Sequence, residues 1–206
     1  LVGFGTIDFN RPIADQVREI HDLGFPGIKL HPAAQKFDVL GEQAWELYRE
    51  AERLGLFLTF HTGIHWHRIK DYHVIHFDEV AYHFPELRFS LEHLGGYHFY
   101  YEALAVILNN MRRRDGGRTS NVYGGLTSVF EREKQRHWYM GPERLKDAVW
   151  QLGAGQLIFG LDFPYNGIAE AKSAIEMIRG LGLSSEEEDL ILAGNLERVL
   201  GIGSGR

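Results

Sequence analysis

Four apolar segments of this chain each end on a side chain that can hold a metal ion. They are GIKLH, which ends at His31, LFLTFH at His61, LRFSLEH at His93 and QLIFGLD at Asp162. Short apolar runs rich in Ile, Leu and Phe are typical of buried strands. In a barrel of parallel strands, the carboxyl ends of the strands form the catalytic rim, so we expect these four side chains to meet there.

The composition fits one globular domain and excludes several classes of protein. The 206 residues are 44% hydrophobic and 24% charged, which is enough apolar material for one sizeable core. A net charge of -6 without a long basic run argues against nucleic acid or a membrane surface as a partner. The chain has no cysteine, so histidine and carboxylates are left as metal ligands. No stretch has the length of a membrane span and residues 1–10 do not resemble a signal peptide, so we expect a cytoplasmic enzyme.

Strand-like runs alternate with segments of helical period along the whole chain, which is typical of repeated β–α units around a parallel sheet. Six strands are predicted, at residues 1–8, 27–31, 56–61, 87–93, 120–126 and 156–162. Helices are predicted near residues 11–23, 45–54, 77–84, 97–113, 142–152 and 169–179, with a short closing helix after residue 194. The cluster Arg112-Arg113-Arg114, which precedes Asp-Gly-Gly, is interpreted as a solvated turn.

The number of strands is lower than in a complete barrel. A (β/α)8 TIM barrel has eight strands and usually needs about 250 residues. The sequence begins with Leu1, which leads directly into the first strand-like run. We therefore expect an α/β fold of the TIM-barrel type, a single domain over residues 1–206 that lacks about two N-terminal β–α units. The absent strands would leave open sheet edges and exposed core, which proteins usually cover by pairing, so a homo-oligomer is expected.

Five motifs, in order along the chain, resemble one family. They are GIKLHP (27–32), HTG (61–63), FPELRFSLEHLGG (84–96), LIFGLDFP (157–164) and AGNLERVLGI (193–202). Together they resemble the amidohydrolase-related group of the amidohydrolase superfamily. That group contains metal-dependent TIM-barrel hydrolases and decarboxylases similar to aminocarboxymuconate semialdehyde decarboxylase. The resemblance covers nearly the whole chain.

The resemblance implies a role for each residue at a strand end. His61, on the strand that matches the family's fifth, would be a metal ligand. Asp162, on the strand that matches the eighth, would be a ligand that also handles the proton of the metal-bound water. His93, on the sixth, would be the catalytic histidine, and His31, on the fourth, would face the substrate. The family's His-x-His pair on its first strand has no counterpart in this sequence, which leaves His61 and Asp162 from that metal set.

The residue types alone are compatible with hydrolysis by activated water. A divalent ion, most simply zinc with manganese as an alternative, lowers the pKa of bound water to about 7. An aspartate beside it can accept the proton, and a second histidine can stabilise the developing oxyanion. The sequence therefore predicts a metal-dependent hydrolase of a small carboxylated or cyclic substrate. Two alternatives stay open, namely a nonoxidative decarboxylase that uses His93 and Asp162, and a non-catalytic barrel remnant.

Other residues have competing interpretations. A single histidine at the end of a strand is more often a hydrogen-bonded packing residue than a ligand. Lys29, two residues before a strand end, is interpreted as a structural or substrate-side lysine rather than a carbamylated metal ligand. His65-Trp66-His67 lies in a loop, so we interpret it as a rim segment that contacts substrate or a neighbouring subunit rather than as a metal site. Gly124-Gly125 weakens the fifth predicted strand but allows close approach of another group.

Overall fold

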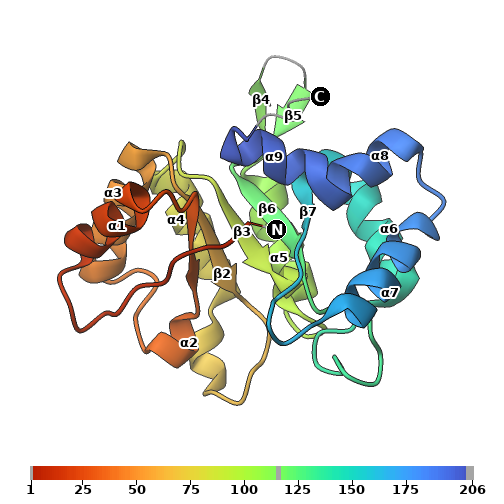
Figure 1. Ribbon diagram of the computed structural model, residues 1–206, viewed down its shortest axis with the longest axis horizontal. Helices are drawn as coiled ribbons and strands as arrows, with labels where there is room; N and C mark the ends of the chain where they lie inside the picture. Colours follow the sequence, from red (N-terminus) through yellow and green to blue (C-terminus); the bar gives the residue numbers. More distant parts are fainter. Residues whose placement is uncertain (1, 115–116, 203–206) are drawn as a thin grey trace.

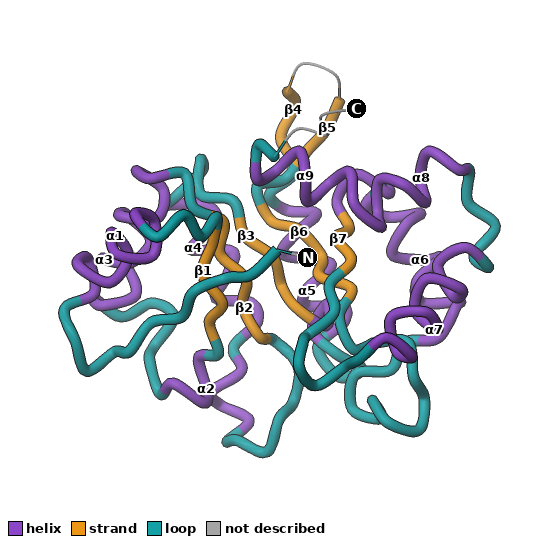
Figure 2. Tube along the Cα trace, in the orientation of Figure 1, coloured by secondary structure: helices purple, strands orange, loops and turns teal. Residues whose placement is uncertain are grey.

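The fold is a parallel sheet with helices packed around it (Figures 1 and 2). The computed structural model describes residues 2–114 and 117–202. In this part of the chain the main sheet has five strands: β1 (Gly27–Leu30), β2 (Phe57–His61), β3 (Phe89–Glu92), β6 (Val122–Leu126) and β7 (Leu157–Phe159). Each strand pairs in parallel with the next one along the chain. Consecutive parallel neighbours are the arrangement of strands in a TIM barrel, so the predicted α/β fold is confirmed.

Helices connect these strands and flank the sheet. They are α1 (Ile13–Asp22), α2 (Pro32–Gln35), α3 (Glu42–Leu54), α4 (Phe77–His83), α5 (Tyr100–Asn109), α6 (Gly141–Leu152), α7 (Ile168–Arg179), α8 (Ser185–Asp189) and α9 (Asn195–Leu200). In Figure 1, α1, α3 and α4 lie on one side of the strands and α6, α7 and α8 on the other. None of the described helices is both long and apolar enough to cross a lipid bilayer.

The first predicted strand is reduced to a single bridge beside β1. Gly5 pairs in parallel with Ile28, and it donates its N–H to Gly27 O (3.0 Å) and accepts from Lys29 N (2.8 Å). A Cβ on Gly5 would come within 2.8 Å of the Ile20 side chain in α1, so the close packing of this segment requires glycine. Glycine weakens a strand, and the prediction of a regular strand over residues 1–8 was wrong. Residue 1 lies outside the described residues.

The arginine cluster does not form a turn. Instead, β4 (Arg112–Arg114) pairs antiparallel with β5 (Gly117–Thr119), and the pair projects from the top of the molecule in Figure 1. Helix α5 ends earlier than predicted, at Asn109. The next residue, Asn110, turns its side-chain amide to Val106 O and Asp78 Oδ1, both at 2.8 Å, and such local bonds compete with helix continuation.

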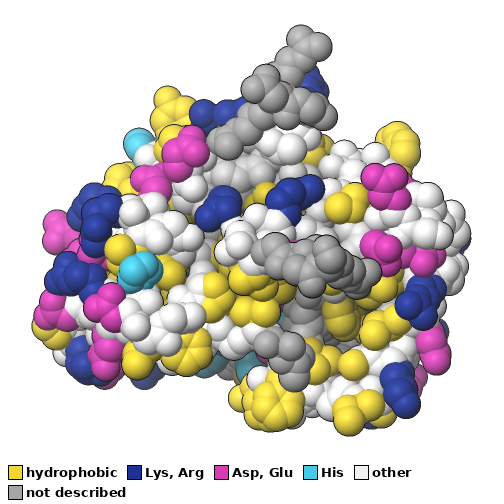
Figure 3. Space-filling view, turned by 45° about the horizontal axis from the view of Figure 1, so that its top comes forward, with side chains coloured by type: hydrophobic (Ala, Val, Ile, Leu, Met, Phe, Trp, Pro, Cys, Tyr) yellow, Lys and Arg dark blue, Asp and Glu magenta, His cyan; other side chains and the backbone are white. Residues whose placement is uncertain are grey.

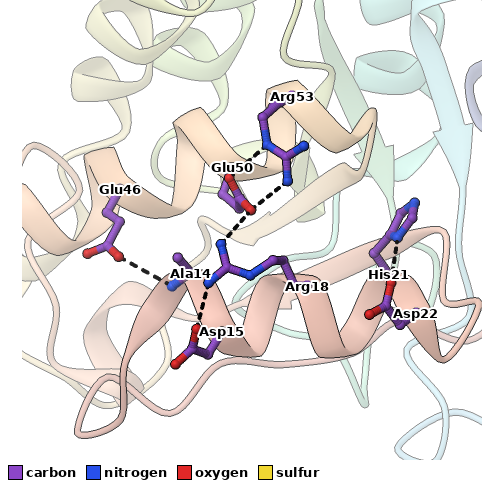
Figure 4. Close-up of polar contacts among 8 residues, drawn as sticks. All are labelled: Ala14, Asp15, Arg18, His21, Asp22, Glu46, Glu50 and Arg53. Atoms are coloured by element: carbon purple, nitrogen blue, oxygen red, sulfur yellow. Dashed lines mark hydrogen bonds and ion pairs between the residues drawn. The ribbon is translucent and has the colours of Figure 1, made fainter.

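Helices α1 and α3 pack side by side on the outside of β1 (Figure 4). Ile13 and Val17 of α1 are buried. Arg18 joins Asp15 (2.6 Å) and Glu50 of α3 (3.0 Å) at the surface. Exposed ion pairs of this kind contribute about 0–1 kcal/mol, so apolar packing holds the two helices together.

The two faces of the sheet have different side chains because successive residues of a strand point to opposite sides. On the face toward the helices, Phe60 of β2 contacts Tyr48 of α3 and Phe77 of α4. On the other face, Phe57, Tyr123 and Ile158 form a small apolar cluster with Val199 of α9. Nearer the carboxyl ends, this inner face becomes polar, with the buried residues Thr59, Ser90 and Glu92. A polar layer thus lies between an apolar floor and the carboxyl edge of the sheet.

Candidate functional site

Three of the four side chains predicted at strand ends meet at the carboxyl edge of the sheet. His61 is the last residue of β2, and His31 and His93 directly follow β1 and β3. The rings of His31 and His61 stack with their centroids 3.9 Å apart, and the centroids of His61 and His93 lie 4.7 Å apart. Asp162 lies three residues beyond the end of β7, in the left-handed backbone region with φ of 57°.

His31 is fixed by the turn that follows β1. It precedes Pro32, the first residue of α2, and its Nδ1 accepts a hydrogen bond from Ala34 N at 3.2 Å. A backbone N–H can only donate, so Nδ1 carries a lone pair and the neutral ring has its proton on Nε2. That Nε2–H donates to Nδ1 of His65, 3.3 Å away. Nε2 of His31 is therefore committed to His65 in this arrangement.

His65 belongs to the same cluster, which the sequence interpretation of its loop did not anticipate. The N–H groups of His65 and His67 donate to the hydroxyl of Tyr72, at 2.7 and 3.2 Å, and this folds the loop back over the end of β1. One ligand atom from each of His31, His61 and His65 lies within 4.8 Å of the others, a separation that a metal ion can bridge. His67 lies at the margin, with its ring centroid 5.5 Å from that of His31.

Backbone carbonyls determine which nitrogens of His61 and His93 are free. His61 Nε2 lies 2.6 Å from Gly63 O, and His93 Nδ1 lies 2.6 Å from Thr127 O. A carbonyl oxygen only accepts, so both of these nitrogens carry protons. In the neutral rings, the remaining nitrogens, His61 Nδ1 and His93 Nε2, then face each other with lone pairs at 3.1 Å.

Burial keeps these imidazoles neutral. It lowers the pKa of His31 to about 3, and the neighbouring His65 and Lys29 add to the effect. Burial also lowers the pKa of His61, and the neighbouring His93 and His31 add to the effect. For His93, burial and Lys29 lower the pKa, against the opposing effect of Asp162 and other acceptors. Neutral imidazole is the form that binds metal ions.

The donor set fits a divalent cation at His61. Two lone pairs that face each other in a buried site repel, and a cation bound to one of them removes that cost. The carbonyls of Gly63 and Thr127 orient His61 and His93 in the way that outer-shell acceptors orient metal-binding histidines in other proteins. His61 also belongs to the group of three histidines that can share an ion.

Asp162 is held by a chain of buried side-chain hydrogen bonds. The amide of Gln135 donates to Asn166 Oδ1 (3.1 Å), and Asn166 Nδ2 donates to Ser128 Oγ (2.7 Å) and to Leu161 O (2.9 Å). Ser128 Oγ in turn donates to Asp162 Oδ2 at 3.2 Å. Asp162 is not in the group of ligand atoms found among the described residues, so its role as a metal ligand stays a prediction.

Comparison with known proteins identifies the family. A family profile described as Amidohydrolase matches residues 1–202. The chain belongs to the amidohydrolase family. No curated protein sequence matches it.

Solved structures show the same fold as this amidohydrolase. An uncharacterized TIM-barrel protein from Bordetella bronchiseptica has 22% identity and a TM-score of 0.74, over 97% of this chain and 66% of that one. A candidate 2-pyrone-4,6-dicarboxylic acid hydrolase from Pseudomonas putida has 19% identity and a TM-score of 0.64, over 96% and 71% of the two chains. A dihydroxybenzoic acid decarboxylase from Polaromonas sp. JS666, with bound manganese and 2-nitroresorcinol, has 15% identity and a TM-score of 0.68, over 98% and 69%. The chain thus spans about two thirds of these barrels, as expected for an incomplete barrel.

Trp138 is a residue of the candidate site that the sequence interpretation missed. Its indole stacks on His93 with centroids 4.6 Å apart and an interplanar angle of 12°, and its edge approaches His61. The indole Nε1 donates to Ile64 O at 2.9 Å. Gly63 makes room for the ring, because a Cβ there would lie 2.5 Å from Trp138 Cδ1. The glycine of the HTG motif was the available sequence signal.

Glu92 was missed as well. The residue is 8% exposed, and its side chain accepts hydrogen bonds from the hydroxyls of Thr59 (2.7 Å), Ser90 (2.6 Å) and Thr127. The signal was the alternation of polar Thr59, Ser90 and Glu92 with apolar neighbours in β2 and β3, which indicates a polar inner face. Lys29, on the same face of β1, acts electrostatically on His31, His61 and His93.

Proposed function

We propose that this chain carries the active-site residues of a metal-dependent hydrolase that acts through metal-activated water. The observation that carries the proposal is the cluster of neutral imidazoles in which His61 Nδ1 and His93 Nε2 present unprotonated lone pairs 3.1 Å apart. Membership of the amidohydrolase family supports it. Since the chain spans about two thirds of the matching structures, both the activity and the substrate are part of the proposal.

Four residues are candidates to hold the metal. His61 is the principal ligand and Asp162 is the predicted carboxylate ligand. His31 and His65 lie close enough to contribute imidazole nitrogens once the hydrogen bond between their rings opens. Zinc is favoured because it accepts imidazole and carboxylate ligands, and manganese is the alternative, supported by the Polaromonas structure. When bound, such an ion makes hydroxide available from water near neutral pH.

The chain's own residues supply the proton transfers. Asp162 Oδ2 accepts a hydrogen bond from the Ser128 hydroxyl. Oδ1 is then able to take a proton from water and return it to a leaving group. His93 keeps Nδ1–H on Thr127 O, so its Nε2 is the atom that can exchange a proton or interact with a developing oxyanion. His31, stacked on His61, would form a wall against the substrate.

The proposed substrate is a small carboxylated or cyclic molecule, and nucleic acids and membranes are not proposed as partners. The net charge of -6 argues against nucleic acids and anionic membrane surfaces as partners. We also propose a homo-oligomer in the cytoplasm. Apolar side chains gather near the middle of the face drawn in Figure 3, and proteins often cover such a surface with a partner.

A nonoxidative decarboxylase is the second candidate. The similarity in fold to the manganese-containing dihydroxybenzoic acid decarboxylase favours it. The same His93 and Asp162 would then protonate the carbon that loses carbon dioxide. A barrel without catalysis, which serves as a subunit or binding partner, is the third candidate, because the first-strand His-x-His pair of the family has no counterpart here.

A substrate screen on the metal-loaded protein separates these candidates. Cyclic esters and carboxylated aromatic compounds would be tested in parallel, with acid release as the readout for hydrolysis and carbon dioxide for decarboxylation. Hydrolysis that requires added zinc or manganese and is lost in Asp162→Asn supports the proposal. Carbon dioxide release would replace it by the second candidate, and activity neither with zinc nor with manganese would favour the third.

A further inference from the structure

Glu92 is a buried carboxylate that the proposed chemistry does not use. It is the last residue of β3, and its oxygens accept three hydroxyl hydrogen bonds from three separate segments. Thr59 of β2 and Ser90 of β3 bind Oε1, and Thr127, after β6, binds Oε2. Each of these hydroxyl hydrogens therefore points toward the carboxylate, as expected for an ionised acceptor.

The neighbouring strand is shaped to admit this carboxylate. Gly125 of β6 is the register partner of Glu92, and a methyl group at Gly125 would overlap the Glu92 side chain. The adjacent Gly124 instead makes room for Leu94 and Leu157 on the other face. The glycine pair in β6 thus allows a buried side-chain carboxylate to approach the backbone.

The charge balance around Glu92 favours its ionised form. Burial raises the pKa of Glu92, but the positive charge of Lys29 and the hydroxyls of Ser90 and Thr127 outweigh burial, and the pKa is lowered overall. No carboxylate among residues 2–114 and 117–202 forms an ion pair with Lys29 within 4.0 Å. Glu92 and Lys29 therefore act on each other through space rather than as a closed salt bridge.

Glu92 is directly connected to the histidines of the site. Its register partner on β2 is His61, and the next residue in the chain is His93. Thr127 links the two groups, because its hydroxyl donates to Glu92 while its carbonyl accepts from His93 Nδ1. In a poorly hydrated region, the negative charge of Glu92 interacts with a cation bound at His61 much more strongly than it would in water.

We propose that Glu92 is a positioning residue that supplies the buried negative charge needed to hold a divalent cation at His61 beside the ammonium of Lys29. The proposal rests on the metal-dependent function proposed above. Glu92 does not touch the cation; it offsets the repulsion from Lys29 and fixes Thr127, which orients His93. Lys29 has the opposite effect and lowers the affinity of the site for a cation.

Charge can be separated from packing with two substitutions at Glu92. Glu92→Gln keeps the size and can still accept the hydroxyls of Thr59 and Ser90, but it removes the charge. Glu92→Asp keeps the charge but shortens the side chain, so it disturbs the hydrogen bonds to Thr59 and Ser90 more than Glu92→Gln does. Because outer-shell substitutions commonly cost 10–100-fold in metal affinity, we expect Glu92→Gln to weaken zinc binding by about tenfold or more. We expect Glu92→Asp to weaken it less.

Lys29→Met provides the reciprocal test and does not depend on the folding of a Glu92 variant. Removal of the opposing positive charge should tighten zinc binding severalfold, and Lys29→Met/Glu92→Gln should bind more tightly than Glu92→Gln alone. Binding would be measured by competition with a chromophoric zinc chelator, on variants whose cooperative urea unfolding shows that they are folded.

The possible results are distinct. Weaker binding by Glu92→Gln than by Glu92→Asp, together with tighter binding by Lys29→Met, supports the proposal. A larger loss in Glu92→Asp than in Glu92→Gln, or no change in zinc affinity in Glu92→Gln and Lys29→Met, would overturn the role of Glu92 and leave the proposed function intact. Absence of zinc and manganese binding in the wild-type protein would instead refute the proposed function and, with it, this role.

Discussion

Replacement of Gly63 by alanine tests how the Trp138 indole packs over the candidate site. Gly63 lies directly under the indole of Trp138, and an added Cβ would come 2.5 Å from Trp138 Cδ1 and 2.6 Å from Nε1. The indole cannot retreat without losing its hydrogen bond to Ile64 O and its stack on His93. The Gly63 backbone itself is not in the left-handed region, so a clash rather than strain would be the cause of any change.

The expected cost follows from these contacts. Overpacking in a well-packed region typically costs about 1–3 kcal/mol. Loss of the Trp138–Ile64 hydrogen bond adds about 1 kcal/mol. Gly63→Ala should therefore lower the free energy of unfolding by about 2–4 kcal/mol and change the tryptophan fluorescence of the folded protein.

Urea unfolding followed by circular dichroism gives the free energy, and a double-mutant cycle identifies its cause. In a Trp138→Leu background, the clash is relieved, so the added cost of Gly63→Ala should fall below about 1 kcal/mol. Gly155→Ala is the matched control, because its nearest contact would be Arg198 Nη2 at 3.9 Å and its backbone is not left-handed. A Gly63→Ala protein with wild-type stability and fluorescence would refute the assigned position of Trp138.

Three further predictions concern the polar residues. His61→Ala should abolish zinc binding without unfolding the chain. His93→Asn should retain zinc and lose turnover. If elemental analysis shows that His93→Asn has lost zinc, His93 is a ligand instead. Asn166→Ala should lower turnover by about tenfold or more, because it frees the Ser128 hydroxyl that holds Asp162, and unchanged kcat would contradict this. His31 stays neutral in the fold to a pH of about 3 but is protonated in the unfolded chain below about 6.5, so stability should fall as pH decreases through this window. His31 can change the free energy of unfolding by at most about 1.4 kcal/mol per pH unit, and by less because its ring is partly exposed. Urea unfolding at pH 7 and pH 5 should therefore show that the free energy of unfolding depends less on pH in His31→Gln than in the wild type.

The sequence predicted the structure correctly where one strong local pattern determines a strand or the end of a helix. Apolar runs that end at His31, His61 and His93 correctly predicted parallel strands whose carboxyl ends bring these residues together. The helix predicted near residues 45–54 ends at Leu54 as expected, because Gly55 follows it in the left-handed conformation with φ of 70°. In both cases a local preference agrees with the packing of the whole domain.

The sequence failed where distant packing overrides local preference. Gly5 looks like part of a strand, but it makes a single bridge to Ile28 and packs against the Ile20 side chain of α1. His65 is brought to the site by the hydroxyl of Tyr72, seven residues away, and no short-range pattern encodes that contact.

Residues around the site were missed for a related reason. Trp138 lies between β6 and α6, far from His93 in sequence, and only the tertiary fold places its ring there. Glu92 was visible as a polar residue in an apolar strand, but its three hydroxyl partners come from separate segments. The pattern of apolar and polar residues thus predicts which residues lie at strand ends better than it predicts the side chains that surround those residues in the fold.

The proposed metal site at His61 is tested by calorimetric titration of the metal-free protein with zinc, repeated on His61→Ala. The imidazole cluster predicts about one equivalent of zinc bound by the wild-type chain and no specific binding by a folded His61→Ala variant. A wild-type chain that does not bind zinc, or a His61→Ala variant that binds it with unchanged affinity, would contradict a metal site at His61.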